Sequence, residues 1–191
     1  MRTVEIIGYK RANLGKSESK RLRETGHSPC VLYGGKDQVH FYSPMILFRD
    51  VVYRPEPAFV KLNIEGDIYH AIMQDVQFHP VNEIINHVDF LELSEDRMIK
   101  MSIPINFEGT SPGVVQGGKL TTKLRSVTVK AYPKNMPEKI TLDISTLDLG
   151  KSLKVSNIIA KDFEVLNSPR VTIATVEIPR VLKGTETEAA Q

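Results

Sequence analysis

The sequence predicts a mainly β protein with short helices, built from two domains and a tail. Apolar and polar residues alternate along most of the chain, and a period of two is typical of strands with one buried face. The polar run Ser-Glu-Asp at 94–96 divides the chain into halves of different character. We therefore expect domains at 1–94 and 95–180, followed by a flexible, largely polar tail at 181–191.

Strands dominate the first half of the chain. Residues 2–9 form a plausible first strand. Residues 59–64 and 68–76 are expected to form a hairpin, because the Glu-Gly-Asp run between them is a polar turn that contains glycine. Residues 85–93 alternate loosely enough to form another strand. The first domain is therefore expected to be mostly β.

Two short helices interrupt these strands. Ser17 is a candidate N-cap for a helix that runs through Thr25 and stops at the glycine that follows it. Ser43 followed by Pro44 gives the N-cap and first-turn proline pattern of a second helix, which would reach about Tyr53.

The second half is expected to be an almost all-β domain of antiparallel strands. Short turns that contain Gly, Pro or Asn separate its alternating segments. These segments are residues 101–107, 126–132, 139–144 and 170–178.

A glycine-rich run at 113–119 has the glycine and lysine spacing of a phosphate-binding P-loop. The next residue is Leu120, where magnesium coordination needs a Ser or Thr hydroxyl. Residues 121–132 alternate like a strand and do not open a helix. We therefore interpret the run as a glycine-rich loop and expect no nucleotide cofactor.

Charge is distributed unevenly along the 191 residues, although the formal net charge is only +2. Residues 1–36 carry a net charge of +5, residues 37–94 a net charge of −6, and residues 95–191 a net charge of +3. A positive segment beside an acidic remainder favours a localised site for a polyanion over a uniformly adhesive surface.

The single cysteine and the hydropathy indicate a cytosolic protein. Cys30 excludes an internal disulfide framework, and its apolar neighbours suggest a small buried hydrophobe without a catalytic role. No apolar run approaches the ~20 residues that a membrane span requires. Lys10 and Arg11 interrupt the N-terminal segment before the apolar core of a signal peptide could form.

The basic stretch at 10–23 has the composition of a phosphate-binding segment. A helix over 18–25 would place Lys20 and Arg23 on one face and Arg21 on a neighbouring face. The small residues before it let the backbone approach a phosphate closely, and a helix N-terminus favours anions. Basic clusters are also common on solvated helices, so this pattern alone leaves an ordinary surface helix open.

Aromatic, imidazole and carboxylate groups occur at Tyr33, His87 and Asp89. Tyr33, which precedes two glycines, can offer its ring and hydroxyl to a nucleic acid, although a tyrosine at the edge of the core is the ordinary alternative. In a strand, His87 and Asp89 point to the same side and can meet one ligand together. Their spacing, with His79 included, matches no metal template, so we expect neither a metal site nor catalysis.

Taken in order, these segments resemble the twenty-fifth large-subunit ribosomal protein of bacteria, a family also called the general stress protein CTC family. The second half resembles the C-terminal domain of the longer members, so the resemblance covers nearly the whole chain. The succession of motifs is more specific than any single one. In the first half the motifs are Gly15-Lys16, Lys20-Arg21-Leu22-Arg23, Leu32-Tyr33-Gly34-Gly35, Gln74-Asp75-Val76-Gln77, His79-Pro80 and His87-Val88-Asp89-Phe90. In the second half they are Ile103-Pro104-Ile105, Glu108-Gly109, Ser111-Pro112-Gly113-Val114, Gly117-Gly118 and Leu153-Lys154-Val155-Ser156.

The resemblance implies an N-terminal β-barrel with short helices that binds the loop E region of 5S ribosomal RNA, and an additional C-terminal β domain. It carries the RNA-contacting positions over to Arg11, Arg21, Tyr33, His87 and Asp89, all of the expected residue type. Residues of the same segment that are expected to assist are Lys16, Ser19, Lys20 and Arg23.

Two positions depart from the family pattern. Ser17 stands where some members have a second glycine, which changes how closely the backbone can approach the RNA. Phe78 stands where some relatives have a basic residue, so a phosphate contact is not expected there.

The chemistry of these residues suits an RNA helix, whose wide minor groove displays 2′-hydroxyls and base edges. Arg11 and Arg21 would clamp phosphates with their planar guanidinium groups. Asp89 cannot favour a phosphate, but it can accept a hydrogen bond from a ribose hydroxyl or a base amino group, with His87 donating or accepting beside it. We assign Asp89 to specificity and not to affinity.

The sequence thus predicts a non-catalytic, cytoplasmic, ribosome-associated protein of the large ribosomal subunit that binds 5S ribosomal RNA through its N-terminal domain. We expect no membrane, small-molecule substrate or cofactor, and we expect the C-terminal domain to contact neighbouring RNA or ribosomal proteins. One alternative is a stress-induced RNA-binding protein that acts off the ribosome. A second is a metal-dependent hydrolase that uses His79, His87 and Asp89, which would require a concave pocket and a bound metal.

Overall fold

The structure is a computed structural model that describes residues 1–159 and 162–179. The tail expected at 181–191 lies outside the described residues. The chain forms two compact units, of which the first comprises Met1–Met101 and Tyr132–Met136, and the second Ser102–Ala131 and the residues from Pro137 onward. The domain boundaries expected from the sequence stay predictions.

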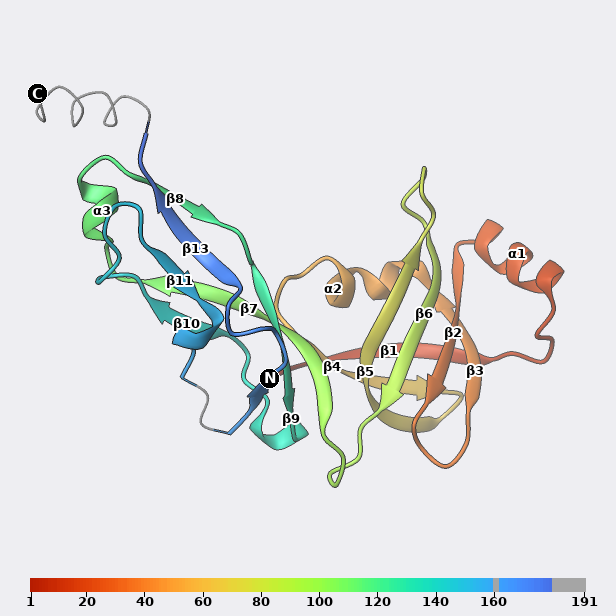
Figure 1. Ribbon diagram of the computed structural model, residues 1–191. Coiled ribbons are helices and arrows are strands. Elements are labelled where there is room, and N and C mark those ends of the chain that lie inside the picture. Colours follow the sequence, from red (N-terminus) through yellow and green to blue (C-terminus); the bar gives the residue numbers. More distant parts are fainter. Residues whose placement is uncertain (160–161, 180–191) are drawn as a thin grey trace, which may run out of the picture. The chain divides into compact units, whose positions relative to one another are not determined.

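The first unit contains a closed six-stranded barrel with the strand order β1-β3-β2-β6-β5-β4 (Figure 1). Strands β1 and β4 pair in parallel and close the barrel, β2 and β6 also pair in parallel, and the other neighbours are antiparallel. The barrel and the mainly β class are confirmed. The strands are β1 (Arg2–Lys10), β2 (His27–Tyr33), β3 (Val39–Pro44), β4 (Ala58–Ile64), β5 (Asp67–Phe78) and β6 (Ile85–Glu92).

Aromatic side chains fill the barrel interior. Phe41, Phe48 and Phe90 are fully buried, and the Phe90 ring centroid lies 5.8 Å from that of Phe41 and 6.2 Å from that of Phe48. Alternate residues of β4 are buried, as the period of two predicted. The barrel is therefore a packed core, and any RNA contact must be made by its outer surface.

The predicted hairpin is present as β4 and β5. Ile64 pairs with Asp67, so the loop contains two residues and not the three expected. Glu65 and Gly66 both have positive φ values, 54° and 101°, which are typical of a type I′ turn.

Both helix starts differ from the sequence prediction. The first helix, α1 (Lys16–Glu24), begins at Gly15 as N-cap and not at Ser17. Ser43 caps no helix, because it lies within β3, where its hydroxyl donates to the carbonyl of Ile7 across 2.7 Å. Sheet pairing holds this backbone extended, and the helical segment follows it as η1 (Met45–Phe48) and α2 (Arg49–Val52). None of the described helices has the length and hydropathy needed to span a bilayer.

The second unit consists of two small sheets, ordered β10-β7-β9-β12 and β11-β13-β8. The expectation of antiparallel strands throughout was wrong, because β7 and β10 pair in parallel. The glycine-rich run at 113–119 was expected to be a loop, but its first residues belong to one helical turn, α3 (Pro112–Val115). The run then leads into the strand β8, where strand-like alternation was expected. The strands are β7 (Ile99–Glu108), β8 (Lys119–Thr122), β9 (Ser126–Ala131), β10 (Ile140–Asp143), β11 (Ser152–Lys154), β12 (Glu164–Val165) and β13 (Thr172–Glu177). This unit also contains the single turn η3 (Val155–Asn157), whereas the turn η2 (Pro133–Asn135) belongs to the first unit.

Candidate nucleic-acid interface

Strand β6 presents an imidazole and a carboxylate on the outside of the barrel. Val88 and Phe90 are fully buried in the core, whereas His87 and Asp89, at the intervening positions, are half-buried on the outer face. The same-side placement is confirmed, because His87 Nδ1 lies 2.6 Å from Asp89 Oδ1. With Nδ1–H donating to the carboxylate, a neutral His87 ring presents Nε2 as an acceptor.

The neighbouring strands add polar groups to the same surface. Asp75 and Gln77 of β5 are paired with Asp89 and His87, respectively, so two carboxylates stand opposite each other. The pKa of the Tyr33 hydroxyl, at the end of β2, is raised by partial burial and then by the charges of Asp89 and Asp75. Tyr33 therefore shares this surface with both carboxylates. The sequence interpretation included Asp75 and Gln77 in a motif of the family but not among the RNA-contacting residues, because their positions depend on the register of two strands.

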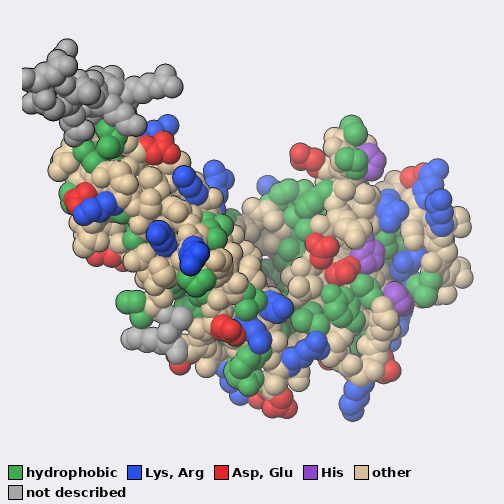
Figure 2. Space-filling model, viewed as in Figure 1, with side chains coloured by type: hydrophobic (Ala, Val, Ile, Leu, Met, Phe, Trp, Pro, Cys, Tyr) green, Lys and Arg blue, Asp and Glu red, His purple; other side chains and the backbone are tan. Residues whose placement is uncertain are grey.

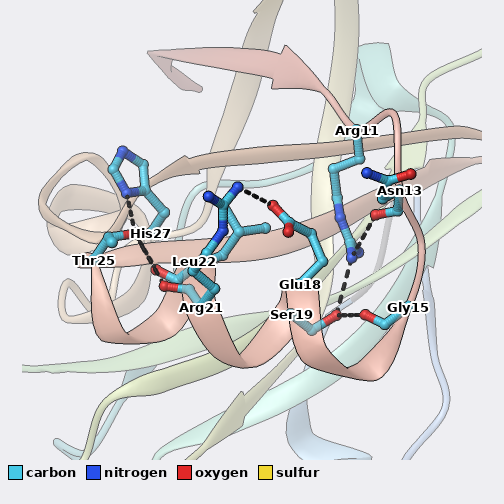
Figure 3. Close-up of polar contacts among 9 residues, drawn as sticks. All are labelled: Arg11, Asn13, Gly15, Glu18, Ser19, Arg21, Leu22, Thr25 and His27. Atoms are coloured by element: carbon cyan, nitrogen blue, oxygen red, sulfur yellow. Dashed lines mark hydrogen bonds and ion pairs between the residues drawn. The ribbon is translucent and has the colours of Figure 1, made fainter.

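Arg11 joins the end of β1 to helix α1. Its guanidinium Nη2 donates to the carbonyl of Asn13 across 3.2 Å and to the hydroxyl of Ser19 across 2.9 Å (Figure 3). The Ser19 hydroxyl in turn donates to the carbonyl of Gly15 across 3.1 Å. Arg11 Nε is buried and has no hydrogen-bond partner in the described parts of the chain. This guanidinium therefore organises the loop before α1.

Helix α1 is held to the barrel on one side and exposed on the other. Leu22 is 7% exposed, and Arg23 Nε donates to the carbonyl of Asn86 in β6 across 3.0 Å. At its C-terminus the hydroxyl of Thr25 donates to the carbonyls of Arg21 and Leu22 (Figure 3). The contact with Asn86 fixes the helix directly beside the His87 and Asp89 pair.

The cations of α1 have different environments. Arg21 is exposed, and its guanidinium lies 2.7 Å from the Glu18 carboxylate, whose hydrogen bond and charge raise the pKa of Arg21. Lys20 is exposed, with its ammonium 3.8 Å from Glu24, and Lys16 is exposed in the first turn. Arg23 is half-buried against β6. Lys16, Lys20 and Arg21 are therefore exposed, the last two in ion pairs within the helix, whereas Arg11 and Arg23 position the helix.

Contacts link Arg11 to Ser19, Arg23 to the carbonyl before His87, and His87 to Asp89, and the other cations lie on the same helix. We call the nine expected residues together the α1–β6 surface. Figure 2 shows blue cationic side chains over α1, with purple and red side chains over the strands on the same side of the barrel. The cations lie at the helix, and the imidazole and carboxylates lie on the strands. The surface comprises Arg11, Lys16, Ser19, Lys20, Arg21, Arg23, Tyr33, His87 and Asp89.

The other histidine considered, His79, forms hydrogen bonds within a turn. Its Nδ1 accepts hydrogen bonds from the backbone N–H groups of Val81 and Asn82, both across 3.3 Å, in the turn between β5 and β6. Among the described residues, no group of three or more His, Cys, Asp or Glu side chains is arranged to hold a metal ion. The chemistry available on the α1–β6 surface is hydrogen bonding and charge.

Two family models match the chain. The model of the Ribosomal L25p family matches residues 6–90, and the model of the C-terminal domain of ribosomal protein TL5 matches residues 98–180. The chain is 53% identical over 189 residues to the large ribosomal subunit protein bL25 of Amoebophilus asiaticus, an alignment that covers 99% of this chain and 96% of the relative. It is 52% identical over 191 residues to the bL25 protein of Cytophaga hutchinsonii and 38% identical over 198 residues to that of Phocaeicola vulgatus, with full coverage of both chains in each case.

Proposed function

We propose that this chain, which belongs to the bacterial L25 (CTC) family and is a structural constituent of the large ribosomal subunit, binds 5S ribosomal RNA through the α1–β6 surface. As a component of the bacterial ribosome it is a cytoplasmic, non-enzymatic protein. The hydrolase alternative is overturned by these relatives.

The observation that carries the proposal is that cations lie on α1, whereas an imidazole and a carboxylate lie on the neighbouring strand β6. Lys16, Lys20 and Arg21 point exposed cations away from the barrel, and cations supply most of the affinity for a sugar–phosphate backbone. The His87 and Asp89 pair stands on β6, beside the strand carbonyl that Arg23 holds. An RNA duplex whose backbone lies along α1 would present its minor groove to that pair.

The His87 and Asp89 pair offers acceptors at fixed positions. The Asp89 carboxylate offers acceptor oxygens, and a His87 ring whose Nδ1–H donates to Asp89 offers Nε2 as a second acceptor when it is neutral. Ribose 2′-hydroxyls and base amino groups are the donors that an RNA minor groove provides. Phosphates have no hydrogen-bond donor, so the Asp89 carboxylate repels a sugar–phosphate backbone placed against it. It accepts a hydrogen bond when the minor groove, with its hydroxyl and amino donors, lies there instead. Loop E is the part of 5S RNA that the family resemblance implies.

The proposal is tested with Arg21→Ala and a matched control. Arg21 forms an ion pair with Glu18, and the control residue Lys61 forms one with Glu5. Lys61 lies on β4, which adjoins neither β2 nor β6. Binding to a loop E fragment of 5S RNA is measured by gel shift over a range of salt concentrations. Arg21→Ala should weaken binding and reduce the slope of log K against log salt by about 0.7 to 0.9, the value for one phosphate contact. Lys61→Ala should leave the slope unchanged.

An unchanged slope for Arg21→Ala would contradict a phosphate contact at this residue. The off-ribosome alternative is separated by sedimentation of the full chain with large subunits. A chain that remains in the unbound fraction while binding 5S RNA in isolation would favour that alternative.

A further inference from the structure

The outward side of the β11-β13-β8 sheet is entirely polar at its paired positions. In this sheet Thr121 of β8 pairs with Thr175 of β13, which in turn pairs with Ser152 of β11. The hydroxyls of Ser152 and Thr175 lie 2.8 Å apart. Three hydroxyl side chains therefore form a row across the sheet, with neighbouring strands about 4.8 Å apart.

Lysines flank this hydroxyl row. Lys119, two residues before Thr121, is paired with Glu177, and Lys154, two residues after Ser152, is paired with Thr172. Lys123, two residues after Thr121, donates its backbone N–H to Ile173. Figure 2 shows Lys and Arg side chains over these strands. Alternate residues of a regular strand are about 7 Å apart, which places Lys119 beside Thr121 on the same face. Lys154 follows a register shift after Leu153, and Lys123 comes directly after the end of β8.

The lysines are exposed, and one carboxylate on this face, that of Glu177, stands opposite Lys119. Lys119, Lys123 and Lys154 each form no ion pair with another described residue, whereas Lys151, at the margin of the sheet, is paired with Asp148 across 2.6 Å. The inward positions of the same strands pack Leu120, Leu153 and Val176 into a core, so the alternation is that of a sheet with one buried face.

We propose that this hydroxyl and lysine face binds a ribosomal RNA backbone without reading its sequence. Lysine and hydroxyl side chains are both common donors to phosphate oxygens. The paired outward positions carry no Arg, Asn, Gln or aromatic group, which are the usual readers and stacking partners of bases. Protein interfaces, in contrast, have aromatic and apolar anchors and are poor in lysine. The face therefore fits RNA better than a protein partner.

The experiment compares two triple variants of the full chain. The test variant carries Lys119→Ala, Lys123→Ala and Lys154→Ala. The control carries Lys130→Ala, Lys134→Ala and Lys139→Ala, which remove the same charge outside the β11-β13-β8 sheet. The probe is deproteinised long ribosomal RNA of the large subunit, with 5S RNA added to saturation so that the α1–β6 surface is occupied. A second arm uses large subunits depleted of this protein.

The test variant should bind both probes more weakly, and its slope of log K against log salt should fall by about 2 to 3, while the control keeps the wild-type slope. Binding of a 5S RNA fragment should be the same for both variants, which separates this proposal from the function proposed above. An equal loss in the control would show only a general charge effect and would overturn the proposal. A loss seen with depleted subunits but not with deproteinised RNA would indicate a protein partner and would also overturn it.

Discussion

The guanidinium of Arg11 donates to the hydroxyl of Ser19 across 2.9 Å and so connects the end of β1 to the first turn of α1. The N-cap of this helix, Gly15, has no side chain that could satisfy the free N–H groups of the first turn. The first turn is held instead by side chains that bond to its hydroxyl and carbonyl groups: Arg11 donates to Ser19, and the Ser19 hydroxyl donates to the Gly15 carbonyl. The Arg11 and Ser19 side chains therefore hold the first turn of α1 to the end of β1.

Ser19→Ala should lower the free energy of unfolding by about 1 kcal/mol, because it removes a donor and acceptor that Arg11 and Gly15 use. The matched control is Ser17→Ala, because Ser17 is exposed in the same turn and its hydroxyl forms no hydrogen bond with a described residue. Urea unfolding followed by circular dichroism measures both. Equal stability of the two variants would show that the Arg11 and Ser19 contact does not hold the helix.

Glu18→Gln should strengthen binding to 5S RNA. The Glu18 carboxylate lies 2.7 Å from the Arg21 guanidinium and competes with a phosphate for it, and its own charge repels the backbone. Gel shifts at low and high salt should show a gain that is largest at low salt. Glu83→Gln serves as the control, since Glu83 carries the same charge in the turn between β5 and β6. A weaker Glu18→Gln complex would mean that Glu18 orients Arg21 for the contact.

The parts of the fold that follow from local pattern were predictable from the sequence. The alternation at 2–9, at 59–76 and at 85–93 corresponds to β1, β4, β5 and β6, and period-two geometry placed His87 and Asp89 on one side. The start of α1 was misplaced because a local preference of Ser17 for the N-cap was outweighed by contacts of Ser19 with Arg11 and Gly15.

Features that depend on contacts distant in sequence were not predictable. Strands β11 and β12 have three and two residues, too few to show a period, and the parallel pairing of β7 with β10 is set by the whole sheet. In the candidate site, Asp75 reaches Asp89 only through the register of β5 on β6. Arg23 was expected beside Lys20 as a ligand contact, but its guanidinium binds a strand carbonyl that only the fold supplies.

Cys30 should be unreactive toward thiol reagents in the folded protein. Burial raises the pKa of its thiol above the ordinary value, and the nearby Asp89 charge raises it further, so the reactive thiolate is scarce at neutral and mildly alkaline pH. Labelling with a chromogenic disulfide at pH 8 should be slow in buffer and rapid in 8 M urea at the same pH. Rapid labelling of the folded chain would show that the barrel opens readily at β2, which carries Cys30 and pairs with β6.

Asp89→Ala should reduce discrimination between RNAs more than it reduces affinity. Removing the carboxylate takes away an acceptor for the groove and also a negative charge that repels a misplaced backbone, so binding to an unrelated duplex RNA should be equal to or tighter than wild type. Binding to the loop E fragment should weaken, because a base or ribose donor loses its partner and the His87 ring loses the contact at 2.6 Å that orients it.

Asp75→Ala is the matched control, since it removes the same charge from the paired position on β5. The ratio of the two affinities, measured by competition at one salt concentration, should fall further for Asp89→Ala than for Asp75→Ala. An equal loss of binding to both RNAs would contradict a readout role and would assign Asp89 to the stability of the surface.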